Sequence, residues 1–371
     1  ALALAGSPPL AGARADASEA PAPLGALVYG LAGPVTALGW LLRTAADLPG
    51  LPGGWTIMLA LLGGLGALAC GAGALGERRL RAILAWVTAG QTALVVATLG
   101  LAGGRAAVAG PGLLVSLMLT ATVGAAATAT LERTTGSDDY TAGGAAPPRI
   151  TGAVWALAAA ASLGLPPLWG FWPRLWLLLE AQQQQPWLLA PLIAGAILTT
   201  LALLAPLAKL WPTESGTGRA HVAWMDVIPA LIAGLPLLIL GVAPGLAWAP
   251  WLEATPAAPA DLPASQGAQL ATVVAGLALV ALVAVAGIAA PARMLERDPD
   301  EEPVRLAPDA LGAALRPLAW MGSLTPLLRV LWAGLQLASK ALHFLIGLFE
   351  QRYYLLGVLA ALITIMLLMA Q

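Results

Sequence analysis

The chain has 371 residues, of which 59% are hydrophobic and only 10% are charged. Soluble domains carry roughly 25% charged residues, so this composition indicates a membrane protein. The formal net charge of −1 gives no support for binding nucleic acid. A single cysteine, Cys70, excludes an internal disulfide, and two histidines, His221 and His343, are too few for a metal centre, so we expect no cofactor.

Apolar segments that are long enough to cross a membrane recur along the chain. A membrane-spanning helix needs about 20 mostly apolar residues. The candidates, in chain order, are Pro21 to Leu42, Gly53 to Leu75, Ile83 to Gly103, Pro111 to Leu131, Ile150 to Leu165 continuing through Leu168 to Leu179, Trp187 to Trp211, Val227 to Trp248, Leu270 to Ala290 and Tyr354 to Met369. We therefore predict an all-α membrane protein with about ten transmembrane helices.

One of these segments is interrupted by glycine and proline before it resumes. Gly164 is followed by the pair Pro166-Pro167, and Arg174 lies just beyond the interruption. Prolines remove backbone donors, so the carbonyls that are freed must be satisfied by neighbouring helices or by water. A cation within a membrane span costs roughly 2.5 kcal/mol or more and normally faces a bundle interior or a hydrated path. A broken helix with a buried cation is typical of ion-translocating membrane proteins.

The segment from Ala307 to Glu350 is apolar but contains too many charged residues for an ordinary span. This pattern favours an amphipathic helix that lies along the membrane surface or against a partner bundle. Pro317 and Pro326 are expected to kink this helix or to split it in two. An alternative interpretation is a pair of loops around one amphipathic span. In both cases the last span, Tyr354 to Met369, follows as a C-terminal anchor.

Four motifs in this order resemble those of one family of membrane subunits. They are Glu19-Ala20-Pro21-Ala22-Pro23, Arg81-Ala82-Ile83-Leu84-Ala85-Trp86 followed by Gln91, Gly164 to Arg174, and the stretch from His221 to Gly241. The sequence thereby resembles the antiporter-like membrane subunits of respiratory complex I, an NADH-quinone oxidoreductase. The same family includes subunits of multisubunit cation/proton antiporters and of membrane-bound hydrogenases.

The resemblance implies a domain organisation. Subunits of this family carry two inverted repeats of five helices with flanking helices. Residues 1–248 are expected to form the second-half antiporter-like repeat with flanking spans, and residues 249–306 an additional span with polar connectors. Residues 307–371 would hold the lateral amphipathic helix and the anchor span. By this comparison the chain is truncated at its N-terminus, enters midway through the repeat junction and lacks the first repeat.

The same resemblance implies that most of the proton relay has been lost. The family uses lysines and histidines inside the membrane. Its junction lysine falls on Leu4, its two histidines fall on Ser116 and Thr120, and the lysine of the same helix falls on Gly124. Hydroxyl groups hold water but do not exchange charge near neutral pH. The sequence therefore resembles a degenerate member of the family.

Three ionisable residues remain candidates for a proton path. Arg174 stands where the family has its second-repeat lysine, but arginine keeps its positive charge and releases no proton usefully. It is either an electrostatic remnant or a cation that bonds the loose carbonyls of the Pro166-Pro167 break or reaches the interface. Glu180 is a path residue or a carboxylate at a helix end. Lys209 is an exit-side lysine or an interfacial anchor.

We therefore expect a membrane-arm subunit of a complex I-like proton-translocating oxidoreductase that is chiefly structural and not itself catalytic. Its partners would be other membrane subunits and the lipid bilayer, in a bacterial inner membrane. One alternative is an active proton half-channel that uses Arg174, Glu180 and Lys209. Another is a scaffold or assembly subunit of a different respiratory or photosynthetic complex.

Overall fold

The computed structural model describes residues 32–47, 53–101, 104–141, 149–210, 224–244, 307–322 and 325–369. In these ranges the regular elements are ten α-helices and one short 3-10 helix, which confirms the prediction of an all-α protein. The chain divides into two compact units, each held together by its own internal contacts: Ala1–Leu324 and Thr325–Gln371. The predicted span Leu270 to Ala290 and the first motif, Glu19 to Pro23, lie outside the described residues.

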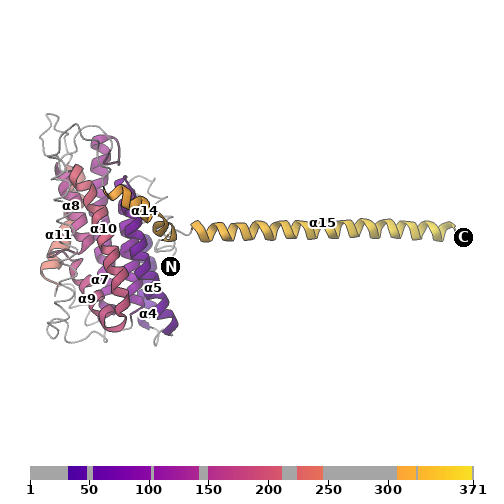
Figure 1. Ribbon diagram of the computed structural model, residues 1–371, viewed down its shortest axis with the longest axis horizontal. Helices are drawn as coiled ribbons and strands as arrows, with labels where there is room; N and C mark the ends of the chain where they lie inside the picture. The colour runs from indigo at the N-terminus through magenta and orange to yellow at the C-terminus, as the bar shows by residue number, and fades with distance from the viewer. Residues whose placement is uncertain are drawn as a thin grey trace. The chain divides into compact units, whose positions relative to one another are not determined.

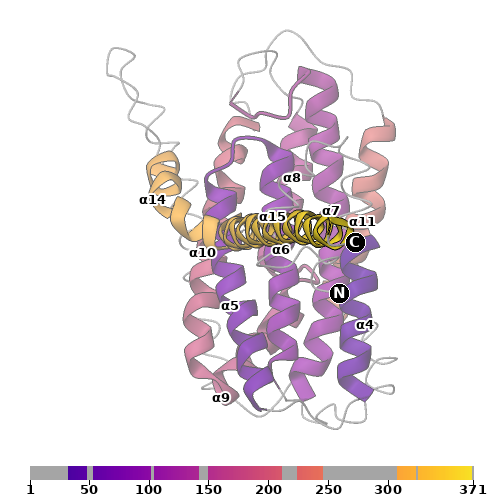
Figure 2. The same ribbon diagram turned by 90° about the vertical axis from the view of Figure 1, so that its right-hand side faces the viewer.

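The first four helices described lie side by side in a bundle (Figures 1 and 2). They are α4 (Gly33–Asp47), α5 (Gly53–Leu75), α6 (Leu80–Leu99) and α7 (Gly104–Thr135). Helix α7 begins before the predicted start at Pro111 and contains that proline. Pro111 is the eighth residue of α7, so the helix loses one backbone hydrogen bond there and continues through the proline.

The predicted break is present, since α8 (Arg149–Leu163) ends before the two prolines and α9 (Phe171–Gln184) begins after them. Gly164 has a φ of +70°, a left-handed conformation that glycine adopts without steric cost. Its N–H donates to Ala161 O, and Leu165 N donates to Ala160 O at 3.0 Å. These two bonds form a Schellman motif, which ends α8 and satisfies its last carbonyls.

Neighbouring helices accept hydrogen bonds from the interrupted segment, whereas the prediction concerned donors for its freed carbonyls. Trp169 N donates to Leu237 O at 2.8 Å, and the Trp169 indole donates to Gly112 O at 3.0 Å. The first partner belongs to α11 (Trp224–Val242) and the second to α7. The break is therefore fixed on two sides by the bundle.

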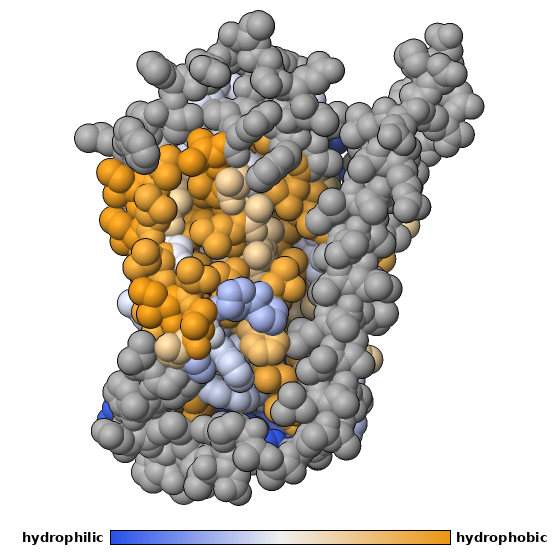
Figure 3. All heavy atoms as spheres, turned by 90° about the vertical axis from the view of Figure 1, so that its left-hand side faces the viewer, coloured by the Kyte–Doolittle hydropathy of each residue, from blue (hydrophilic) through white to orange (hydrophobic). Residues whose placement is uncertain are grey.

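A short 3-10 helix, η2 (Pro186–Leu188), leads into α10 (Leu189–Leu210). In the described ranges, four helices are long and apolar enough to cross a membrane, namely Gly53–Leu75, Leu80–Leu99, Gly104–Thr135 and Pro186–Leu207. Shorter apolar helices are Ile150–Leu163, Val227–Val242 and Tyr353–Met369. The outward side of α11 exposes Leu231, Ile232 and Leu235, and Figure 3 shows a broad hydrophobic area on this face. Such a surface suits contact with lipid tails or with another membrane subunit.

Small residues bring the bundle helices close together. A Cβ on Gly63 of α5 would lie 2.4 Å from Ala97 N of α6, and one on Gly195 of α10 would lie 2.8 Å from the Ala67 carbonyl carbon of α5. Small residues at helix contacts allow close backbone approach, which is how membrane helices gain packing energy without a hydrophobic effect between them.

The C-terminal segment is split, as Pro317 and Pro326 lead us to expect, but only at one place. Helix α14 (Ala307–Gly322) contains Pro317, while α15 (Thr325–Met369) begins just before Pro326. Proline fits the first turn of a helix because its missing N–H has no partner there. The structure differs from the prediction of a separate final span, since Tyr354–Met369 continues α15 without interruption. No proline separates the two parts, so nothing in the sequence ends the helix between them.

Candidate functional site

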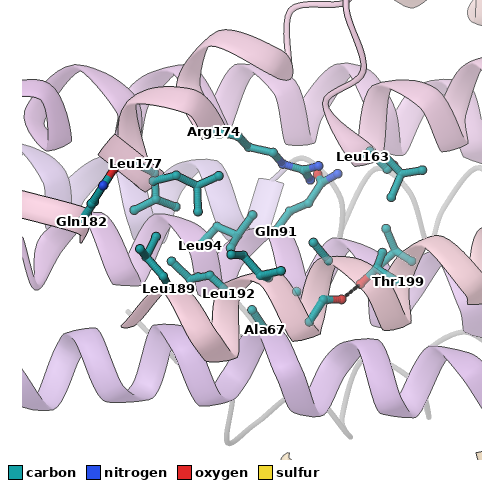
Figure 4. A pocket seen from close by; sticks show the side chains of 17 residues that line it. Ala67, Gln91, Leu94, Leu163, Arg174, Leu177, Gln182, Leu189, Leu192 and Thr199 are labelled. Carbon is teal, nitrogen blue, oxygen red and sulfur yellow. Dashed lines mark hydrogen bonds between the residues drawn. The ribbon is translucent and has the colours of Figure 1, made fainter. Parts of the chain in front are cut away.

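A cavity of about 110 Å³ lies between α5, α6, α8, α9 and α10 (Figure 4). A water molecule needs roughly 10–15 Å³ of such volume, so the cavity has room for several. Most of its wall is apolar. Five residues with polar side chains line it: Gln91 of α6, Ser162 of α8, Arg174 and Gln182 of α9, and Thr199 of α10.

Arg174 is positioned by the break. Helix α9 begins at Phe171, so Arg174 occupies its first turn and the side chain reaches the cavity. Its stem packs on Gly164, where an added Cβ would lie 2.9 Å from Arg174 Cδ. Gly164 is thus required both for its positive φ and for the room it leaves the arginine.

Within the described part of the chain, Arg174 forms no ion pair, and no hydrogen bond joins it to a carbonyl of the break. Its side chain is half-buried and lines the cavity. A cation at bilayer depth is costly by roughly 2.5 kcal/mol or more, and arginine does not escape this cost by losing its proton. The cavity therefore contains a fixed positive charge.

Gln91 is the polar residue that Arg174 approaches. Figure 4 shows the guanidinium and the Gln91 carboxamide pointing toward the same part of the cavity. Gln91 is only 4% exposed; Thr120 Oγ1 lies 3.1 Å from its Oε1, and its Nε2 has no hydrogen-bond partner. A buried donor without a partner costs about 1–3 kcal/mol. The amide nitrogen is thus a buried donor without a hydrogen-bond partner, on a residue that lines the cavity.

The positions that the resemblance marks as lost relay sites lie along one face of α7. Ser116, Thr120 and Gly124 are spaced by four residues, and they face α6 and the break. Ser116 Oγ lies 2.9 Å from where a Cβ on Gly170 would stand. A Cβ on Gly124 would lie 2.5 Å from Leu84 Cδ1, so Leu84 fills the space beside this position. A polar track from Ser116 through Thr120 and Gln91 leads toward Arg174.

The other two candidates do not join this track. Glu180 is 6% exposed, accepts a hydrogen bond from Gln184 Nε2 and does not line the cavity. Lys209 belongs to the last turn of α10, but its side chain lies outside the described part of the structure. Leu4 also lies outside the described residues. The structure thus brings Ser116 and Thr120 close to Arg174 through Gln91, and it leaves Glu180 apart.

Sequence reasoning did not assign roles to Ser162, Gln182 and Thr199, which line the cavity, or to Gln91, which appeared only as part of a motif. Their signal was a polar side chain in an otherwise apolar helix. That signal is weak, because threonine hydroxyls in helices commonly bond the carbonyl of the preceding turn, as Thr199 does with Gly195 O at 2.8 Å.

A second polar cluster joins the loop after α7 to the start of α6. Asp138 Oδ2 lies 2.8 Å from Arg81 Nε and 3.3 Å from Arg79 Nε. Arg81 Nη2 also lies 3.6 Å from a carboxylate oxygen of Glu132. Burial acts to raise the pKa of Asp138, but the hydrogen bond and charge of Arg81, with the charge of Arg79, lower it below its usual value. This cluster is a structural clamp at one end of the bundle.

Comparison with known proteins gives one family match. The family described as NADH:quinone oxidoreductase/Mrp antiporter, transmembrane, matches residues 14–201, about half of the chain. No curated protein sequence matches the chain.

Solved structures of several respiratory and antiporter complexes share the fold. The Mrp complex from Dietzia sp. DQ12-45-1b matches with 25% identity and a TM-score of 0.61, over 82% of this chain and 34% of that one. Respiratory complex I from Thermus thermophilus matches with 23% identity and a TM-score of 0.59, over 66% and 53% of the two chains. An archaeal membrane-bound sulfane sulfur reductase matches with 18% identity and a TM-score of 0.61, over 74% and 56%. The chain therefore spans between about a third and somewhat more than half of the length of these relatives.

Proposed function

Because the chain belongs to the NADH:quinone oxidoreductase/Mrp antiporter transmembrane family, we propose that it is a membrane-arm subunit of a complex I-like proton-translocating assembly whose antiporter-like bundle is chiefly structural. It is an integral membrane protein with several apolar spans, and the proposal extends this to about ten spans in a bacterial inner membrane. The solved relatives are parts of multisubunit membrane complexes, so its partners would be other membrane subunits of such an assembly.

One observation carries this proposal. Among the described residues that line the cavity, only Arg174 is ionisable, and the others with polar side chains are amides and hydroxyls. Transfer of a proton through a membrane protein needs groups that gain and lose a proton near neutral pH. Neither guanidinium nor hydroxyl does so. The polar track thus keeps the geometry of a relay without a proton carrier.

A second candidate function, the active half-channel, is favoured by the size of the cavity, because water in it would extend the polar track. Arg174, Glu180 and Lys209 would be its ionisable groups. Glu180 supports this less well, since it lies away from the cavity and accepts a hydrogen bond from Gln184. Membership in a different respiratory or photosynthetic complex is the third candidate, and co-purification of the native assembly distinguishes it by the identity of the partner subunits.

Proton uptake by the assembled complex tests the proposal. Arg174→Ala, Glu180→Gln and Lys209→Ala are introduced singly, with Arg316→Ala as the matched control because Arg316 is exposed on α14. We expect each variant that assembles to keep its proton uptake per turnover within twofold of the parent. A loss of tenfold or more in any of the three, with the control unaffected and the amount of assembled complex unchanged, would establish the half-channel instead.

A further inference from the structure

The cavity beside Arg174 has the chemistry of a receptor for negative charge. We propose that it binds a small monovalent anion, such as chloride, between the Arg174 guanidinium and the Gln91 amide nitrogen. The site rests on the proposed function in one respect, because Arg174 has to be a fixed charge and not a proton carrier.

The first support is a cation without a counter-charge. Arg174 lines the cavity, and among the described residues that line it there is no carboxylate. The acid nearest in sequence on the same helix, Glu180, is outside the cavity wall and is engaged with Gln184. Arg174 is half-buried and keeps its charge, so stabilisation has to come from a ligand that carries the opposite charge or from water.

The second support is independent of Arg174. Gln91 is buried, and its Nε2 has no hydrogen-bond partner. Its Oε1 faces the Thr120 hydroxyl at 3.1 Å, although that hydroxyl lies closer to Ser116 O at 2.7 Å. A buried donor that is left unpaired is a feature that a ligand explains. Arg174 and Gln91 both line the cavity, and the guanidinium and the unpaired Gln91 Nε2 are N–H donors.

The remaining wall decides the kind of anion. It is mostly apolar, with Leu94, Leu177 and Leu192 among its residues. A phosphate or sulfate carries more charge than one arginine balances, and its oxygens need more donors than this wall offers. A halide needs only to exchange part of its hydration for two or three donors. Gln182, whose Oε1 is an unpaired acceptor, lies in Figure 4 at the other end of the cavity from the Arg174 guanidinium, where it suits a water molecule.

The site is tested on the full chain reconstituted in lipid nanodiscs, with chloride itself as the probe. The ³⁵Cl NMR line broadens when chloride exchanges with a protein site, and added bromide narrows it again by competition. We expect broadening beyond that of empty nanodiscs for the parent and for the exposed control Arg316→Gln. We expect at least a fivefold smaller effect for Arg174→Gln. Equal broadening for the parent and Arg174→Gln would overturn the site.

A second variant keeps the test valid if Arg174→Gln fails to fold. Gln91→Glu places a carboxylate beside the guanidinium, so the protein supplies its own counter-charge. We expect this variant to melt at least as high as the parent and to lose its response to chloride. At a chloride concentration ten times the dissociation constant, replacing gluconate by chloride should raise the melting temperature of the parent by about 2 °C and that of Gln91→Glu by less than 1 °C. A Gln91→Glu variant that responds like the parent would show that chloride acts elsewhere.

The two proposals fail separately. If the parent shows no chloride binding at this site and Arg174→Ala leaves proton uptake unaffected, the anion site is removed and the structural role remains. Retained chloride binding with a large loss of proton uptake in Arg174→Ala removes the structural role and leaves the anion site.

Discussion

Replacing Gly164 by alanine tests whether the break requires glycine at this position, both for its positive φ and for the space that a Cβ would occupy. Gly164 has a φ of +70°, and a Cβ there would lie 2.7 Å from Gly170 O and 2.9 Å from Arg174 Cδ. The left-handed conformation costs a residue with a Cβ about 1–2 kcal/mol. The steric conflict adds about 1–3 kcal/mol, because Gly170 O belongs to the backbone and cannot rotate away. The total expected loss of stability is about 2–5 kcal/mol.

Gly136 provides a matched control. It has a similar φ of +76°, but nothing lies within 4 Å of the Cβ that alanine would add. Gly136→Ala should therefore lose only the conformational part, about 1–2 kcal/mol. Both variants are compared with the parent by reversible unfolding in mixed micelles, and their melting temperatures in nanodiscs serve as a second measurement. If the two substitutions destabilise the protein equally, the close contacts of Gly164 with Gly170 and Arg174 do not exist as described.

Two further predictions concern the ends and the middle of α7. Asp138→Asn should lose about 1–3 kcal/mol, because it removes the charge that pairs with Arg81 and Arg79. The pKa of Asp138 is lower in the folded protein than in the unfolded chain. The stabilisation from its charge is therefore present above the unfolded pKa of about 3.9 and is lost as the pH falls through the folded pKa. Melting curves from pH 7 to pH 3 should show this loss in the parent and less of it in the variant. Gly124→Ala should destabilise the protein by about 1–3 kcal/mol through its contact with Leu84. The double variant Gly124→Ala/Leu84→Ala should lose less stability than the sum of the losses in the two single variants. If the two losses simply add, the close contact between Gly124 and Leu84 is contradicted.

Several features could be predicted from the sequence because they depend on local chemistry. The apolar runs that became α5, α6 and α10 follow from length and hydrophobicity alone. The break follows from Gly164 together with the adjacent pair Pro166-Pro167, whereas the single prolines Pro111, Pro206 and Pro317 lie inside helices that continue past them. The place where the C-terminal segment splits follows from Pro326.

The candidate site could be predicted less well from the sequence, because it depends on contacts between residues that are distant in the chain. Arg174 and Gln91 lie far apart in the chain, and nothing local to either residue indicates that they share a cavity. Glu180 and Arg174 are close in sequence, but the turn of the helix carries them to different surroundings. Asp138 reaches Arg81 only because α6 and α7 pack side by side.

The sequence by itself determined that this is an all-helical membrane protein of a complex I-like and antiporter-like family, with a broken helix followed by a cation. Hydrophobicity, helix-stopping residues and ordered motifs are properties of consecutive residues, so they can be recognised from the sequence alone. Only the tertiary structure decided that Arg174 faces a cavity with Gln91 and that Glu180 does not. Those relations depend on how α5, α6, α8, α9 and α10 pack against one another, and helix packing is set by contacts between residues distant in the chain.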